Sequence, residues 1–136
     1  MKIAIIDGQG GRIGKALVEQ IKKKWPDREL YAIGTNTLAT SAMLKAGADY
    51  GATGENPCIV NARDAHVILG PVGIVFADSL LGEITPAIAT AVGSSNAYKI
   101  LIPTNRCNHC IVGIGEGTLS QYILQAVQQL ELILNQ

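Results

Sequence analysis

The stretch that decides the fold lies at the start of the chain and reads Lys2-Ile3-Ala4-Ile5-Ile6-Asp7-Gly8-Gln9-Gly10-Gly11-Arg12-Ile13-Gly14. Residues 2–6 form a short run rich in β-branched side chains, which is typical of a strand buried on both faces of a parallel sheet. Residues 11–24 carry apolar side chains at helical spacing and end in three lysines, and Pro26 follows. A strand, a glycine-rich turn and a helix in this order predict the first βα unit of an α/β fold.

The rest of the chain repeats this alternation. We expect further strands near residues 29–33, 49–51, 66–69 and 98–102, and a short sixth strand near residues 111–114. We expect further helices near residues 38–46, 56–64 and 85–92, and a last one from Thr118 or Ser120 to the end. Residues 72–83 fit neither pattern. The sequence therefore predicts one domain over residues 1–136, a three-layer, doubly wound, Rossmann-like parallel sheet of five or six strands.

Composition excludes several classes of function. Eleven Lys and Arg balance 11 Asp and Glu among 136 residues, which argues against a nucleic-acid footprint and against binding to an anionic membrane. Charged residues make up 16%, against roughly a quarter in an ordinary soluble domain. This low share predicts that part of the surface is buried in a homo-oligomer. No signal peptide or membrane span is recognisable, so we expect a cytoplasmic protein.

The last helix has the strongest periodicity. Its apolar stripe consists of Leu119, Tyr122, Ile123, Ala126, Val127, Leu130, Ile133 and Leu134. Leu124 and Leu132 fall outside this stripe, among glutamines and one glutamate. They are either scattered surface leucines or contacts with a neighbouring subunit.

The glycine-rich turn stands where a dinucleotide fold holds its pyrophosphate. Glycines there allow a sharp exit from the strand and a close approach of phosphate to backbone N–H groups at the helix start. A P-loop is excluded because Ala16 stands where Ser or Thr would hold magnesium. The alternative is a tight turn without a ligand. The predicted cofactor-binding residues are Gly8, Gln9, Gly10, Gly11, Arg12, Ile13, Thr35, Asn36, Gly70 and Pro71.

The end of the second expected strand bears on which dinucleotide would bind. A carboxylate there would favour NAD, but this chain has Thr35 and Asn36, which can donate to a 2′-phosphate, with Arg12 nearby. This difference favours NADP over NAD. Alternatively, Thr35 or Asn36 caps the next helix and Arg12 is a solvated first-turn residue. Asp7 would repel a pyrophosphate, so it either braces the loop through backbone N–H groups or faces a less anionic ligand.

The sequence resembles two known families. Ile3-Ala4-Ile5 followed by Gly8-Gln9-Gly10-Gly11-Arg12-Ile13-Gly14 resembles the cofactor loop of dihydrodipicolinate reductases, which implies NADH or NADPH as cofactor. The substrate domain of that family has no counterpart here, so the resemblance supports the cofactor and not the reaction. The whole chain, with Leu81–Pro86 and Ile102–Asn108, resembles a family of short bacterial proteins with no assigned function.

The loops after the later strands should reach the same rim of the sheet. Small residues at Gly70 and Pro71 would pass near the nicotinamide end of a dinucleotide. The candidate catalytic residues are Asp78, Ser79, Glu83 and Cys107. For the first three, turn or cap roles are the alternative.

Cys107, His109 and Cys110 form the most reactive-looking cluster. They could hold zinc, with Cys58 as a further ligand, or the two thiols could form a redox pair. The alternative is that Cys110 is a small core residue and Cys107 is partly exposed. His66 is expected to be a hydrogen-bonded core histidine.

Three functions follow. The first is a small NAD(P)- or nucleotide-binding protein that acts as a sensor or as an oligomeric subunit. The second is an enzyme on a small phosphorylated or carboxylated substrate, with Asp78, Glu83, Arg106 and Cys107 as active groups. The third is a structural or partner-binding module in which the loop is only a turn.

Overall fold

The computed structural model describes residues 1–104 and 109–136. Five parallel strands form one sheet in the order β3-β2-β1-β4-β5. The strands are β1 (Ile3–Asp7), β2 (Leu30–Gly34), β3 (Tyr50–Thr53), β4 (Val67–Pro71) and β5 (Tyr98–Ile102). The helices are α1 (Arg12–Lys24), α2 (Thr37–Lys45), α3 (Glu55–Asp64), the short 3-10 helix η1 (Val72–Val75), α4 (Pro86–Ser94) and α5 (Leu119–Leu134). The predicted doubly wound, three-layer α/β fold is confirmed.

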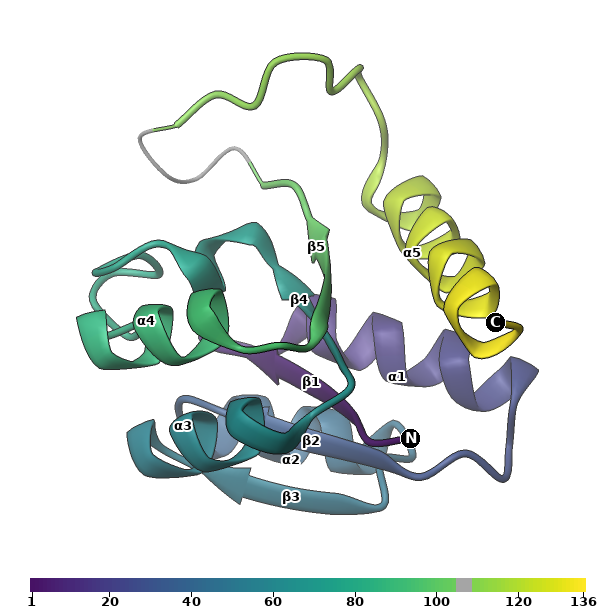
Figure 1. Cartoon of the computed structure of the whole chain (residues 1–136), viewed down its shortest axis with the longest axis horizontal. Coiled ribbons are helices and arrows are strands. Elements are labelled where there is room, and N and C mark those ends of the chain that lie inside the picture. The colour runs from purple at the N-terminus through teal and green to yellow at the C-terminus, as the bar shows by residue number, and fades with distance from the viewer. Residues whose placement is uncertain (105–108) are drawn as a thin grey trace.

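Two apolar cores lie on the two faces of the sheet. Ile3 and Ile5 of β1 pack with α1, α2 and α5, whereas Ala4 and Ile6 pack with α3 and α4. Successive side chains of a strand point to opposite faces, so a strand between two helix layers needs apolar residues at every position. Residues 3–6 are buried, as the apolar pattern predicts, and Asp7, the last residue of β1, is buried as well. In Figure 1, α5 runs beside α1 on one face.

The strand order places a topological switch point between β1 and β4. The chain leaves β1 through α1 toward β2, and it leaves β4 through η1 and α4 toward β5 on the other side. The loops after these two strands therefore diverge and leave a crevice at the carboxyl ends. Residues 109–118 lie beyond the edge of the sheet and lead into α5 (Figure 1).

Three local predictions need correction. Residues 111–114 form no sixth strand, because they are exposed, turn at Gly113 with φ 93° and have no neighbouring strand among the described residues. The third strand lies at 50–53, not 49–51. His66 precedes β4 and is exposed, although its Nδ1 does accept a hydrogen bond from the backbone N–H of Lys2 at 2.8 Å. It is therefore a hydrogen-bonded histidine outside the core.

The stripe on α5 is confirmed. Ile123, Ala126, Val127 and Leu130 are buried against α1 and β5, whereas Leu124 and Leu132 are 53% and 61% exposed. Within the described residues, no helix is both long and apolar enough to span a bilayer.

Candidate functional site

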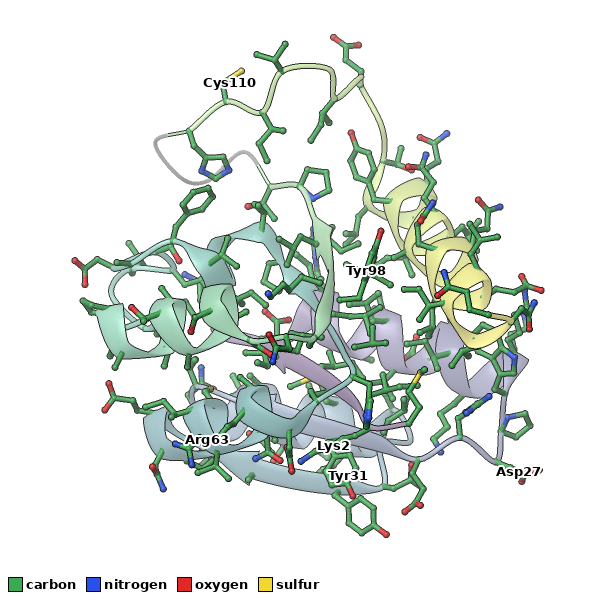
Figure 2. The ribbon with its side chains drawn as sticks, viewed as in Figure 1. Lys2, Asp27, Tyr31, Arg63, Tyr98 and Cys110 are labelled. Carbon is green, nitrogen blue, oxygen red and sulfur yellow. The ribbon has the colours of Figure 1, made fainter. Side chains whose placement is uncertain are left out.

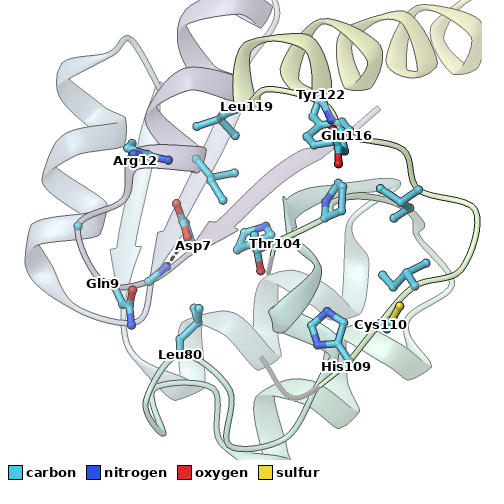
Figure 3. Close-up of a pocket in the computed structure, with 18 of the residues that line it drawn as sticks. Asp7, Gln9, Arg12, Leu80, Thr104, His109, Cys110, Glu116, Leu119 and Tyr122 are labelled. Carbon is cyan, nitrogen blue, oxygen red and sulfur yellow. Dashed lines mark hydrogen bonds between the residues drawn. The ribbon is translucent and has the colours of Figure 1, made fainter. Parts of the chain in front are cut away.

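A pocket of about 950 Å³ opens at the switch point, beyond the carboxyl ends of β1, β4 and β5 (Figure 3). One wall is the glycine loop (residues 8–11) with the first turn of α1. The opposite wall is the segment that leads into α5, which we call the arm (residues 109–118). Pro71, Leu80, Pro103 and Thr104 complete the lining between these walls. The pocket thus lies where the doubly wound topology predicts a ligand.

The predicted cofactor-binding residues divide into two groups. Those that line the pocket are Gly8, Gln9, Gly10, Arg12, Ile13 and Pro71. Those that do not line it are Gly11, Thr35, Asn36 and Gly70. The first group surrounds the ends of β1 and β4. The second group includes both residues at the end of β2, so the pocket does not extend to the side of the loop that faces β2.

Asp7 braces the glycine loop from inside. Its Oδ1 accepts a hydrogen bond from the N–H of Gly8 and its Oδ2 accepts one from the N–H of Gly14, both at 2.7 Å. The carboxylate thus ties the end of β1 to the first turn of α1, one of the two arrangements that the sequence left open. The helix can approach this closely because Gly14 has no side chain, since a Cβ there would lie 3.1 Å from the Cβ of Asp7.

The ionisation of Asp7 is strongly perturbed. Burial raises its pKa to about 6, and the negative charge of Glu83 acts in the same direction, while the hydrogen bonds from Gly14 and Gly8 partly oppose the rise. The side chain is 4% exposed. Asp7 therefore holds a proton up to nearly neutral pH at the base of the pocket.

Part of the loop remains open to a ligand. The N–H of Gln9 is bonded to Glu83 and that of Gly11 to the carbonyl of Gly8, in addition to the N–H groups that Asp7 binds. Within residues 1–104 and 109–136, the N–H groups of Gly10 and Arg12 have no hydrogen-bond acceptor. A Cβ at Gly10 would meet nothing within 4 Å. The N–H of Ile13 lies close enough to Asp7 to lower the pKa of that carboxyl group. The N–H groups of Gly10 and Arg12 are therefore the parts of the predicted anion-binding loop that stay available to a ligand among the described residues.

The charge of the pocket is mixed. Arg12, at the start of α1, is the one Lys or Arg among the described residues that line it (Figure 3). Glu116 lies on the arm, across from the loop. An anionic group would be attracted to the part of the pocket beside Arg12, at the positive end of the α1 dipole.

On the β2 side, the carboxylate of Glu83 fills the space beside the loop. Its Oε1 accepts hydrogen bonds from the N–H of Gln9 at 2.9 Å, from Oγ1 of Thr35 at 2.5 Å and from Nδ2 of Asn36 at 2.8 Å. Burial opposes the charge of Glu83, but these hydrogen bonds outweigh it and lower the pKa. Asn36 also caps α2, because its Oδ1 accepts from the N–H of Ala39 at 2.9 Å, which confirms the capping alternative for Asn36.

The other catalytic candidates lie away from the pocket. Asp78 is exposed in a turn with φ 65°, and its N–H donates to the carbonyl of Ile84 at 2.7 Å. The hydroxyl of Ser79 donates to the carbonyl of Gly73. Neither residue lines the pocket. The contacts that the structure gives them shape the turns around η1, and a catalytic role for either stays a prediction.

The cysteine cluster is divided. Cys107 and Arg106 lie outside the described residues. Cys110 is exposed on the arm (Figure 2), and it lines the pocket together with His109, whose ring packs on Phe76 with centroids 4.6 Å apart. Cys58 is buried in the core with α3 and α4, where burial raises its pKa to about 12. Within the described residues, no three His, Cys, Asp or Glu side chains are placed to hold a metal ion.

Tyr122 holds the arm in place. Its hydroxyl donates to the carbonyl of Gly115 at 2.7 Å and accepts from the N–H of Gly117 at 3.0 Å. The arm then enters α5 through a capping box between Thr118 and Gln121. The periodicity of α5 explained Tyr122 as a core residue, so its contact with the arm and its place in the pocket wall were missed.

A family model described as a domain of unknown function, DUF3842, matches residues 2–135. The chain belongs to the DUF3842 family. This confirms the expected membership of a family without an assigned function. No curated protein matches the chain.

Among solved structures, this DUF3842 chain is similar to the dodecameric FMN-dependent UbiX-like decarboxylase from Escherichia coli O157:H7. The two are 17% identical, with a TM-score of 0.46, and the match covers 95% of this chain and 76% of that chain.

Proposed function

We propose that this DUF3842 protein binds a small anionic ligand of the nucleotide class in the switch-point pocket. The observation that carries the proposal is the pocket wall at the start of α1. There the N–H groups of Gly10 and Arg12 lack an acceptor among the described residues, and the Arg12 side chain lines the same cavity. Backbone N–H groups at a helix start, with a guanidinium beside them, are suited to a phosphate.

The remaining walls suit an organic group attached to that phosphate. Leu80, Ile114 and Leu119 supply apolar surface, and Thr104 supplies a hydroxyl group. A volume of about 950 Å³ lies within the range of small-molecule sites, roughly 300–1,000 Å³. A phosphate at Arg12 would therefore leave room for a base or ring system toward the arm.

NADP or NAD is the finer ligand that the sequence predicts for this site. The glycine loop supports it, because its place between β1 and α1 is that of a dinucleotide loop. The expected 2′-phosphate donors, Thr35 and Asn36, are bonded to Glu83 in the structure. A dinucleotide in the usual orientation would have to displace that carboxylate.

Isothermal titration calorimetry with AMP, FMN, NADP and NAD tests the proposal. We expect Gly10→Val to abolish binding by filling the phosphate space while the protein stays folded. We expect Arg12→Gln to weaken binding about 10-fold, as for loss of a charged hydrogen bond. Lys15→Gln, an exposed residue of α1 that does not line the pocket, is the matched control and should bind as the wild type does. Absence of heat with every ligand would contradict the proposal and favour a structural or partner-binding module.

A second candidate is an enzyme that acts on a small phosphorylated or carboxylated substrate, and Asp7 favours it. A buried carboxyl group with a pKa of about 6 at the base of a pocket can give or take a proton near neutral pH. Saturable binding of inorganic phosphate or sulfate, with no binding of any nucleotide, would favour this candidate.

The proposed homo-oligomer rests on the outer face of α5. Leu124 and Leu132 are both more than half exposed there, at 53% and 61%. Contact between copies through this face would cover them and would account for the low share of charged residues. A native mass spectrum of the titration sample reports the number of subunits together with any bound ligand.

A further inference from the structure

The carboxylate of Glu83 lies at the end of β2, where a dinucleotide fold binds one of the two nucleotides of its ligand. In dinucleotide folds the ribose of that nucleotide is bound at the end of the second strand, beside the glycine loop. Here the groups able to donate to it are the N–H of Gln9, the hydroxyl of Thr35 and the amide of Asn36. All three donate to the single oxygen Oε1 of Glu83, at 2.9, 2.5 and 2.8 Å.

We propose that Glu83 determines ligand specificity by closing the β2 side of the site, so that the pocket accepts a mononucleotide and excludes a dinucleotide. This inference rests on the proposed function and names the ligand class. The contacts around Gly8 support it sterically. A Cβ on Gly8 would lie 2.7 Å from Oγ1 of Thr35, 3.0 Å from Oε1 of Glu83 and 3.0 Å from Cδ1 of Leu80. The space above the glycine is therefore filled by side chains.

The loop that carries Glu83 is well anchored. The N–H of Glu83 donates to the carbonyl of Leu80. The next residue, Ile84, is fully buried; its N–H donates to the carbonyl of Ser79 and its carbonyl accepts from the N–H of Asp78. The carboxylate thus comes from a folded turn. Its displacement would break three hydrogen bonds and uncover their donors.

Charge adds to the steric argument. The three hydrogen bonds keep the pKa of Glu83 below its ordinary value, so this carboxylate is ionised at neutral pH. A carboxylate beside the ribose can accept from its hydroxyls, but Glu83 comes from another loop and occupies the space between the glycine loop and the end of β2. Its negative charge would in addition repel a 2′-phosphate. The opposite side of the loop, toward β4 and β5, holds the open pocket and Arg12.

Matched ligand pairs test the inference, because NAD contains nicotinamide mononucleotide and FAD contains FMN, each joined to AMP. For the pair whose mononucleotide binds, we expect the wild type to bind it at least 10-fold more tightly than the dinucleotide. Glu83→Ala should raise dinucleotide affinity at least 10-fold and change mononucleotide affinity less than 3-fold. Glu83→Gln keeps the length and one acceptor oxygen, so it should retain more of the discrimination than Glu83→Ala. The part of the discrimination that Glu83→Gln loses measures the contribution of the negative charge.

The outcomes separate this inference from the proposed function. Equal affinity of the wild type for both members of a pair would overturn the role of Glu83 and leave the pocket as a nucleotide site. A Glu83→Ala protein that is folded by thermal melting and still rejects the dinucleotide would overturn it as well. If Glu83→Ala does not fold, the ratio of mononucleotide to dinucleotide affinity measured on the wild type decides whether the inference holds. Absence of binding by every nucleotide, AMP included, to the wild type and the variants would overturn the proposed function, and the inference with it.

Discussion

The two sides of the glycine loop differ although they follow from the same βα unit. Toward β2, the loop is packed against Glu83, Thr35 and Asn36, and its polar groups are bonded within the chain. Toward β4 and β5, it faces a pocket of about 950 Å³, and Gly10 has open space beside it. A glycine loop of this kind shows where a ligand can lie, but the side chains around it decide which half of the loop is available.

The largest expected effect is on stability, and it appears when a methyl group is added to one side of the glycine loop and, in a separate variant, to the other side. At Gly11, φ is 71° and a Cβ would lie 2.8 Å from the backbone of Ala39 in α2. We expect Gly11→Ala to lower the free energy of unfolding by about 2–4 kcal/mol, from backbone strain and overpacking. Gly10→Ala, with nothing within 4 Å, is the matched control and should change it by less than about 0.5 kcal/mol. Urea denaturation measures both, and equal losses would show that the loop is packed on both sides.

The next largest effect is a pH dependence of the free energy of unfolding. It comes from Asp7, which lies between the two sides of the glycine loop. Its pKa in the folded state is about 6, above its ordinary value near 4, so the folded protein binds this proton more tightly than the unfolded chain. The stabilisation is therefore complete below about pH 4 and is lost as the pH rises through 6. We expect the free energy of unfolding to fall by about 2 kcal/mol between pH 4.5 and 7.5.

Chemical denaturation at a series of pH values measures this slope, and Asp7→Asn should flatten it. The pKa values of Asp49, Asp64 and Glu83 are lowered, so their contributions have the opposite sign and are lost only as the pH falls toward 4 and below. Stability that stays constant or rises between pH 4.5 and 7.5 would show that Asp7 is not buried as the structure has it.

The smallest expected effect concerns the open side. Tyr122→Phe removes the hydroxyl that binds both Gly115 and Gly117 of the arm, so we expect a loss of about 1 kcal/mol in the free energy of unfolding. Hydrogen exchange of the Gly117 N–H should become faster. Tyr98→Phe, on an exposed tyrosine of β5, should leave both quantities unchanged. An unaltered exchange rate in Tyr122→Phe would mean that the arm is held by other contacts.

Short-range patterns in the sequence were enough to predict the elements. The β-branched run of residues 2–6, the Thr85-Pro86 start of α4 and the stripe on α5 each matched the structure, because periodicity and capping act within a few residues. The prediction of a strand at 111–114 was wrong for the same reason. Two isoleucines and a valine suggest a strand locally, but a strand also needs a neighbour with which to form hydrogen bonds, and the arm has none among the described residues.

The site was only partly predictable. The glycine loop and the rim of the sheet were found because the loop and the topology fix the switch point. The role of Glu83 was not found, since its three donors lie 47 to 74 residues away along the chain. Tyr122 escaped notice because its place in an apolar stripe already explained it.

The sequence by itself determined the alternation of strands and helices, the glycine loop after β1 and the buried face of α5, because each depends on side chains only a few residues apart. The tertiary structure decided that Asp7 turns inward to brace the glycine loop and that Glu83 fills the β2 side of this loop. It also decided that the arm forms the opposite wall of the pocket. These features depend on atoms brought together from distant parts of the chain, and their positions are set only when the sheet and both helix layers are packed.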